Sequence, residues 1–344
     1  MSATAVAPRL HGIRHRRLTV LLALLAAVLV AIVLSITVGS KSVPLADAWH
    51  ALTASTGTEN DIVIRSLRVP RTALGVLAGI ALGVAGALMQ GHTRNPLADP
   101  GLLGVTQGAA FAMVSSIILL GTSSLLAYIW FGLAGALIAS VGVFALGMVG
   151  GRGGPTPVTL ALAGTAVSAL LYALTSAIVL LDEQAMDVFR FWQAGSIAAR
   201  GSEVVWQVLP FILVGLVLAM VNAPGLNALS LGEDVARSLG QNISTTRAVG
   251  VAAVTLLSGA AVAACGSLAF VGLIVPHLAR SLSGTDHRWL LPFSGLIGAA
   301  LLLLADVIGR VVAPPGELEV GVVLALLGAP FFVALVRRRK PVRL

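Results

Sequence analysis

The clearest pattern among the ionisable side chains is a pair of arginines, Arg68 and Arg71, placed just before a long apolar run. A third arginine, Arg310, ends another apolar run further along the chain. A guanidinium can hold a carboxylate through two parallel hydrogen bonds, so these residues suit the recognition of acidic groups. The alternative is that they only extend from helix ends toward water, which is common for arginine at a membrane surface.

The other residue types do not indicate a catalytic or metal site. The six histidines are scattered, and the single cysteine, Cys265, has no partner for a disulfide or a metal cluster, so we interpret it as a small buried hydrophobic residue. Neither of the two lysines, Lys41 and Lys340, lies in a phosphate-binding GxxxxGK[ST] loop. We therefore expect no catalytic residue, no metal and no ATP hydrolysis on this chain.

The elements that position these residues follow from composition. Of 344 residues, 57% are hydrophobic and only 10% are charged, whereas soluble domains average about 25% charged residues. Apolar runs long enough to cross a hydrocarbon core of about 30 Å recur along the chain, and spans in lipid must satisfy their own backbone as helices. The sequence predicts an all-α polytopic membrane protein with ten spans, at 18–38, 69–90, 101–120, 124–149, 157–181, 203–222, 245–264, 267–283, 289–311 and 317–336.

The distribution of charge predicts the orientation. Ten spans place both termini on one side, and most of the 22 Lys and Arg residues then fall on that side, which the positive-inside rule makes cytoplasmic. We expect a basic cytoplasmic segment 1–17, one transmembrane domain 18–336 and a basic cytoplasmic segment 337–344. The first apolar run is longer than a signal-peptide core, so we expect it to be retained. No basic face with interleaved aromatic residues indicates nucleic-acid binding.

Two stretches of similar pattern indicate an internal repeat. Residues 71–105 and 247–277 each begin with arginine, continue through small apolar residues and reach a proline-containing segment. The predicted topology starts them on opposite sides of the membrane, so the repeat would be inverted, as in many transporters.

The longest predicted cytoplasmic loop, 223–244, contains a short helix. Ser230 and Glu233 have the spacing of a capping box, and Gly240 is a typical residue after a helix end. Leu231, Val235 and Leu239 recur every four residues and form one apolar stripe, which suits either a groove in a partner or the protein's own membrane domain.

The spans do not indicate a carrier driven by an ion gradient. Their interiors are almost free of charged residues, so no proton or ion relay is indicated. Either another polypeptide supplies the energy or the protein is a passive channel.

Several motifs together resemble one family. Residues 68–108 contain the two arginines, glycines 75, 79, 83 and 86, and the turn RNPLADP; later stretches read LSLGEDVARSLG, FVGLIVPH, ADVIGR and GAPF. Over about 20–336 the chain resembles the FecCD-type permeases, the membrane subunits of bacterial ABC importers for iron–siderophore complexes, vitamin B12 and haem. One departure is Glu319, where the family usually has proline.

The resemblance implies roles for individual residues. It places contact with the ATPase on Ser230, Leu231, Gly232, Glu233, Val235, Ala236, Leu239 and Gly240. It assigns docking of a substrate-binding protein to Arg68, Arg71 and Arg310. It places the cytoplasmic gate at Asn95, Pro96 and Leu97, with Pro157 and Val158 as the other lip and Gln90 facing either the path or a neighbouring helix.

The resemblance also implies partners and cargo. We expect a second permease, with a heterodimer favoured over a homodimer, two cytoplasmic ATPases that bind ATP and Mg²⁺, and an extracytoplasmic binding protein. Ferric siderophore is the first choice of cargo, followed by cobalamin and haem. The alternatives are an ion-coupled carrier, which would need charged residues at mid-span, and a membrane enzyme, which would need clustered His, Asp or Glu.

Overall fold

The computed structural model describes residues 7–39, 42–54, 57–121, 125–149, 156–314 and 316–338, and every regular element among them is helical. In chain order the elements are α1 (Ala7–Thr37), α2 (Leu45–Thr53), α3 (Glu59–Ile62), η1 (Val63–Arg68), α4 (Val69–Thr93), η2 (Pro100–Leu103), α5 (Val105–Leu120), α6 (Leu125–Met148), α7 (Pro157–Leu181), α8 (Glu183–Ala194), α9 (Ser202–Leu229), α10 (Glu233–Ser238), α11 (Ile243–Cys265), α12 (Val271–Ser283), α13 (His287–Val312) and α14 (Val320–Arg338).

Each predicted span coincides with a helix. Within the described ranges, seven helical stretches are long and apolar enough to cross a membrane. The other three predicted spans correspond to α5, α12 and α14, with 16, 13 and 19 residues. At 1.5 Å per residue α12 is only about 20 Å long, so it reaches part of the way across a bilayer.

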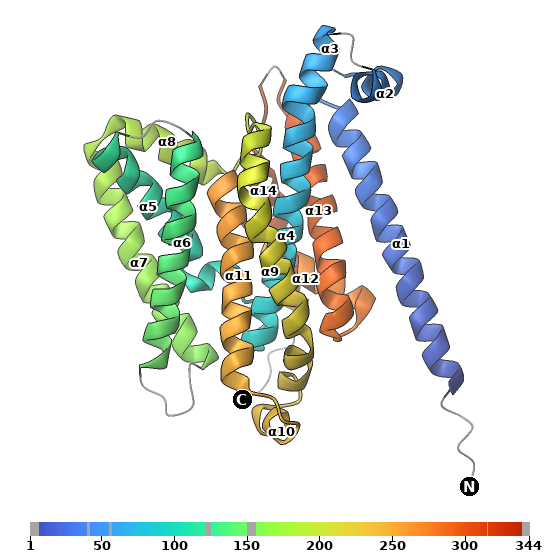
Figure 1. The fold of residues 1–344 in the computed structure, drawn as a ribbon, viewed down its shortest axis with the longest axis vertical. Coiled ribbons are helices and arrows are strands. Elements are labelled where there is room, and N and C mark those ends of the chain that lie inside the picture. Colours follow the sequence, from blue (N-terminus) through green and yellow to red (C-terminus); the bar gives the residue numbers. More distant parts are fainter. Residues whose placement is uncertain are drawn as a thin grey trace.

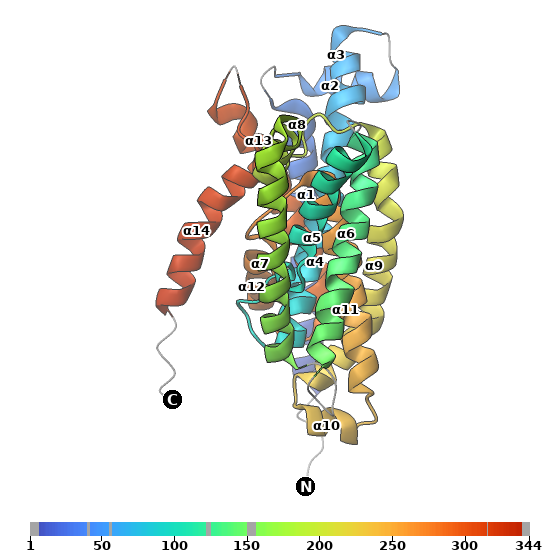
Figure 2. The same cartoon turned by 90° about the vertical axis from the view of Figure 1, so that its left-hand side faces the viewer.

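The helices form a bundle around α4. This helix contacts α9, α11, α12 and α13, while α5, α6 and α7 form a group on one side and α1 lies on the other side against α13. Helices α2, α3 and α8 lie at one end of the bundle, and α10 lies at the other end together with the start of α1 and the end of α14 (Figures 1 and 2). We refer to these as the α8 end and the α10 end.

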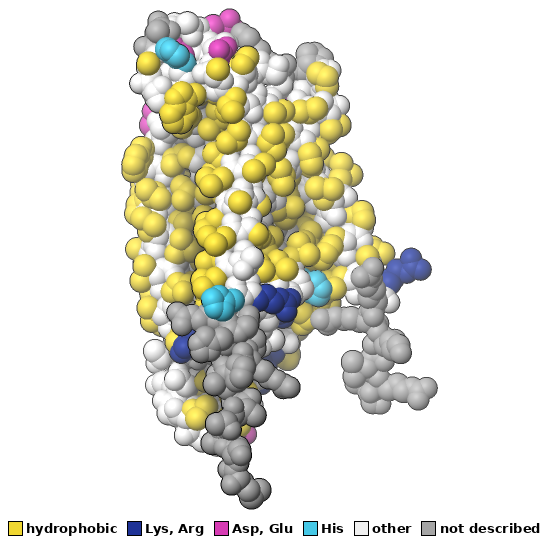
Figure 3. Space-filling view, turned by 90° about the vertical axis from the view of Figure 1, so that its right-hand side faces the viewer, with side chains coloured by type: hydrophobic (Ala, Val, Ile, Leu, Met, Phe, Trp, Pro, Cys, Tyr) yellow, Lys and Arg dark blue, Asp and Glu magenta, His cyan; other side chains and the backbone are white. Residues whose placement is uncertain are grey.

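The surface has the pattern of a membrane protein. Figure 3 shows hydrophobic side chains over the middle of the α1 face, acidic side chains at the α8 end and arginines toward the α10 end. This separation of charge agrees with the distribution from which the orientation was predicted.

Glycines allow the central helices to touch. A Cβ on Gly79 of α4 would lie 2.5 Å from the carbonyl oxygen of Gly298 on α13, and one on Gly86 would overlap the backbone of Gly272 on α12. Small residues at such crossings bring backbones into van der Waals contact, which drives helix association in lipid.

The helix of the sixth predicted span is longer than expected. The prediction ended it at residue 222, before Pro224, but α9 continues through Pro210 and Pro224 to Leu229. Proline is tolerated in membrane helices where neighbouring groups satisfy the freed backbone. The predicted loop 223–244 is therefore shortened, because its first seven residues are helical.

The capping box at Ser230 was wrong. Ser230 follows the end of α9, and its hydroxyl donates to the carbonyl oxygen of Asn227 at 2.6 Å. The residue before α10 is Gly232, whose φ of 117° strongly favours glycine. Glu233 turns to arginines instead of the backbone, as described below.

The two stretches of the predicted repeat run in opposite directions. In Figure 1, α4 descends from the α8 end to the α10 end, and α11 ascends from the α10 end. This is the arrangement expected of an inverted repeat.

Candidate functional site

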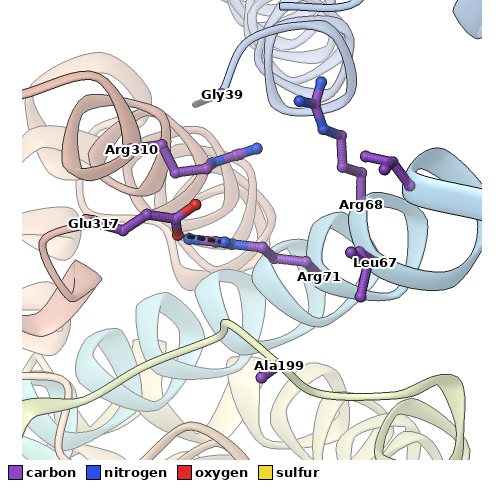
Figure 4. A pocket seen from close by; sticks show the side chains of 8 residues that line it. Gly39, Leu67, Arg68, Arg71, Ala199, Arg310 and Glu317 are labelled. Atoms are coloured by element: carbon purple, nitrogen blue, oxygen red, sulfur yellow. Dashed lines mark hydrogen bonds and ion pairs between the residues drawn. The ribbon is translucent and has the colours of Figure 1, made fainter. Parts of the chain in front are cut away.

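The three predicted docking arginines come together at the α8 end. Arg68 ends η1, Arg71 lies in the first turn of α4 and Arg310 lies in the last turn of α13. They line a cavity of about 340 Å³ together with Glu317, Gly39, Leu67, Val63 and Ala199 (Figure 4). Residues separated by more than 200 positions thus form one pocket.

Arg71 is held by two carboxylates. Its Nε and Nη2 donate to Asp306 Oδ1 at 3.1 and 2.8 Å, and its Nη1 donates to Glu317 Oε2 at 2.7 Å. Asp306 is buried, with 1% of its side chain exposed, whereas 33% of the Glu317 side chain is exposed. The Arg71–Asp306 pair is therefore part of the interior, and Glu317 closes the pocket on its water-facing side.

Arg310 and Arg68 tie α1 to this pocket. Arg310 pairs with Asp306 at 2.7 Å and donates to the carbonyl oxygens of Ser35 and Val38 in and just after α1. Arg68 donates to the carbonyl oxygens of Ile36 and Thr37 at 2.7 and 3.0 Å. Both arginines are buried, so they satisfy backbone groups at the end of α1 that a helix leaves without intrahelical partners.

The charges of the pocket do not cancel. Among the described residues, three guanidinium groups and one carboxylate, Glu317, line the pocket, and a second carboxylate, Asp306, lies buried behind it on Arg71 and Arg310. An incoming carboxylate could take the place of the half-exposed Glu317 on Arg71 without breaking the buried pair with Asp306. The pocket is therefore suited to an acidic side chain, and docking through Arg68, Arg71 and Arg310 stays a prediction.

At the α10 end, the three residues of the predicted apolar stripe are exposed, but only Val235 lies within the short helix α10, while Leu231 precedes it and Leu239 follows it. The exposed fractions of Leu231, Val235 and Leu239 are 64%, 43% and 60%. The opposite side of α10 rests on the bundle through Ala236, which is fully buried against Ala228. The structure thus rests α10 on the bundle through Ala236 and not through the stripe, which points away from it, and contact of the stripe with a partner stays a prediction.

One ion pair joins α10 to α11, and a second lies within α10 itself. Glu233 accepts from Arg247 of α11 at 2.6 Å, and Arg237 pairs with Asp234 at 3.2 Å. Arg247 is 7% exposed, so its pair with Glu233 is mostly shielded from water. After the helix, Gly240 has a φ of 80°, which agrees with its predicted role as the residue that ends it.

The predicted gate turn follows α4 at the same end. The Oδ1 of Asn95 accepts from the backbone N–H of Leu97 at 3.0 Å, which closes a tight turn around Pro96. Arg94 enters this turn with a φ of 50°, an uncommon backbone for arginine. On the other predicted lip, α7 begins at Pro157 and Val158 is 67% exposed.

Gln90 faces a neighbouring helix. It is 2% exposed, and its Nε2 donates to the carbonyl oxygen of Leu273 in α12 at 3.2 Å. Its Oε1 accepts from Arg280 at 3.4 Å. Of the two positions left open for Gln90, the structure favours the helix contact.

Sequence reasoning missed the acidic partners of the arginine pocket. Asp306 lies four residues before Arg310, a spacing at which helical side chains meet, so this pair could have been predicted. The pairs of Arg71 with Asp306 and Glu317 carry no local signal, because they join opposite ends of the chain.

The fold and its two end sites define a class, namely multi-pass helical membrane transport proteins with a polar pocket at one end and a projecting apolar helix at the other. The profile of the FecCD transport family matches residues 8–338. The chain belongs to this family, and as a member it is a multi-pass protein of the cytoplasmic membrane.

Individual relatives agree with the family match. The ferric enterobactin transport system permease protein FepD of Escherichia coli K12 is 47% identical over 316 residues, covering 92% of this chain and 94% of FepD. The cobalamin import system permease protein BtuC of Halobacterium salinarum is 35% identical over 339 residues, covering 94% and 89%. An inward-facing structure of a metal-chelate type ABC transporter is similar with a TM-score of 0.79 and 30% identity, covering 93% of this chain and 99% of that one.

Proposed function

We propose that this chain is the permease subunit of an ABC importer that moves a ferric siderophore across the cytoplasmic membrane. The observation that carries the proposal is similarity over nearly the whole chain to permeases of such importers. Of the two named relatives, the ferric enterobactin permease is the more similar, with 47% identity against 35% for the cobalamin permease. The match includes both end sites, because residues 8–338 span the arginine pocket and α10. Cobalamin is the alternative cargo, supported by the lower similarity to a cobalamin permease.

Energy in this proposal comes from two separate ATPases that bind ATP and Mg²⁺, while this chain itself binds no cofactor. Support comes from the exposed stripe of Leu231, Val235 and Leu239, an apolar surface of the kind that docks into a groove in a partner. The termini and α10 face the cytoplasm in this proposal, in keeping with the arginines near that end.

At the α8 end, an extracytoplasmic binding protein presents carboxylates to Arg68, Arg71 and Arg310. Exchange of Glu317 for a partner carboxylate on Arg71 is the simplest route, since Glu317 is the accessible acid of the pocket. A second permease, identical or a paralogue with the paralogue favoured, completes a path between the two chains, and Asn95, Pro96, Leu97, Pro157 and Val158 form its cytoplasmic gate.

The experiment that tests the cargo is uptake by cells that lack the chromosomal gene and carry it on a plasmid. We expect ⁵⁵Fe to accumulate from ferric siderophores only when the gene is expressed, and labelled cobalamin not to accumulate above background. Cobalamin uptake without iron uptake would move the proposal to the alternative cargo, and uptake of neither would reject both.

A further inference from the structure

Helix α2 lies across the long axis of the bundle at the α8 end, beside the end of α1 (Figures 1 and 2). It contacts α1, α3 and η1. Its buried side consists of two alanines, Ala48 and Ala51, which pack with Val43 and Ile64 in a small cluster separate from the main core. The helix is therefore attached to the protein by one narrow side, and the rest of its surface is exposed.

The exposed surface of α2 divides into an apolar side and a polar side. Leu45, Trp49 and Leu52 are spaced four and three residues apart, which places them on one side of the helix. All three are exposed, and the exposed fraction of Trp49 is 68%. A carboxylate and an imidazole, those of Asp47 and His50, are exposed on the other side. Such a division is typical of helices that lie in the plane of a membrane interface.

A backbone hydrogen bond sets the depth of α2. The apolar stretch of α1 that is long enough to cross the membrane ends at Thr37. The carbonyl oxygen of Thr37 accepts from the backbone N–H of Val43 at 3.0 Å, and α2 begins two residues later. The helix therefore starts at the level where a spanning helix leaves the hydrocarbon, which is also the level at which tryptophan is enriched in membrane proteins.

The apolar side of α2 lies next to a surface that faces lipid. Within its span α1 is mostly exposed, and the uncovered side chains include Leu29, Val30 and Val33. Figure 3 shows hydrophobic side chains reaching from the middle of the α1 face up to the α8 end, with acidic side chains and a histidine at the top. The lipid that covers α1 can therefore also cover the apolar side of α2.

We propose that α2 is an interfacial helix whose Leu45, Trp49 and Leu52 insert into the headgroup region of the membrane, while Asp47 and His50 face water. The segment 42–54 contains no lysine or arginine, so its apolar side chains drive the insertion and no anionic lipid is needed. The assignment of α2 to the outer leaflet rests on the proposed function, but the contact with lipid does not.

Insertion of α2 would fix the height of one wall of the arginine pocket. Arg65 of η1 donates to the carbonyl oxygens of Ala51 and Leu52 at the end of α2, the latter at 3.1 Å. The same η1 ends at Arg68, which lines the pocket. A helix held by lipid would therefore hold Arg68 at a set distance from the membrane surface, where a docking protein would meet it.

The test is a depth measurement with nitroxide labels on the purified full chain in nanodiscs of phosphatidylcholine. The labels are attached to single introduced cysteines, Trp49→Cys on the apolar side and His50→Cys on the polar side of the same helix, because the native Cys265 is buried. We expect the first label to collide more with oxygen, which concentrates in lipid, than with a water-soluble nickel chelate. The label at His50→Cys should show the opposite order. Leu52→Cys, which keeps the tryptophan in place, should behave like Trp49→Cys.

The lipid composition tests how the helix inserts. Addition of phosphatidylglycerol should leave the collision ratio at Trp49→Cys unchanged, and contact with lipid only in its presence would contradict apolar insertion. Equal collision ratios at Trp49→Cys and His50→Cys, or water-like ratios at Trp49→Cys and Leu52→Cys, would overturn the proposal and leave the apolar side of α2 to a protein partner. Because no ATPase, binding protein or cargo is present, such a result leaves the transport function untouched.

Discussion

At the scale of single residues, Asp306 is the centre of the arginine pocket. We predict that Asp306→Asn destabilises the protein strongly, since it removes the charge shared by Arg71 and Arg310 and leaves the latter buried without its ion pair. Breaking a buried pair in this way typically costs about 3–5 kcal/mol. The measurement is the apparent melting temperature of the purified protein in detergent.

The matched control is Asp187→Asn, which breaks the pair with Arg190, where both side chains are 66% exposed. Exposed pairs contribute little, so the melting temperature should hardly change. Equal effects of the two substitutions would show that the Asp306 pairs do not stabilise the fold.

The glycine contacts give a second residue-scale prediction. Gly79→Val should lower the melting temperature or prevent assembly, because its side chain would meet the backbone of Gly298 and Ala299 on α13. Gly142→Val places the same side chain on α6, where a new Cβ meets no atom within 4 Å, and should be tolerated. Thermal unfolding of both variants decides whether the close α4–α13 contact matters.

At the scale of elements, α10 is the part of the chain that we expect to reach the ATPase. Leu231→Asp with Leu239→Asp should abolish co-purification of the ATPase in mild detergent, because charges on the exposed stripe cannot enter an apolar groove. Gln241→Asp adds one such charge beyond the end of α10, outside the stripe, and should leave the complex intact, whereas either single Leu→Asp change should already weaken it. Retained ATPase in the double variant would place the contact elsewhere.

The spans could be predicted from apolar run length, but several element boundaries could not. Pro224 signalled a helix end, yet α9 passes it, because packing in the membrane overrides the local rule. Helix α8 was missed because its polar composition resembles a loop, although Asp182 as its N-cap and Gly195 after its end were readable signals. Helix α2, between the first two predicted spans, was also missed; no side-chain cap marks its start.

The two end sites also differ in how far they could be predicted from the sequence. The apolar stripe of Leu231, Val235 and Leu239 depends on residues four apart, so the stripe could be predicted from local sequence, but its exposure could not, because such a stripe also suits packing on the membrane domain. The arginine pocket depends on pairs such as Arg71 with Glu317, whose partners meet only through the three-dimensional arrangement of α4 and α13. Sequence alone therefore located the arginines but not their partners.

At the scale of the whole molecule, the account predicts which end faces the cytoplasm. The single cysteine, Cys265, is buried, so a cysteine introduced at the surface can be labelled selectively. In intact cells an impermeant maleimide should label Asp187→Cys at the α8 end but not Asp234→Cys at the α10 end. In inside-out vesicles stripped of ATPase the pattern should reverse, and the opposite result would invert the proposed orientation.

The central claim is that this chain transports its cargo with energy supplied by a separate ATPase. The most direct measurement is ferric siderophore uptake into proteoliposomes that contain the co-purified complex and its binding protein. We predict uptake that requires ATP on the α10 side, is unaffected by collapse of ion gradients and is lost in the Leu231→Asp, Leu239→Asp double variant. Uptake by the chain alone that follows an ion gradient and ignores ATP would contradict the account and identify a secondary carrier.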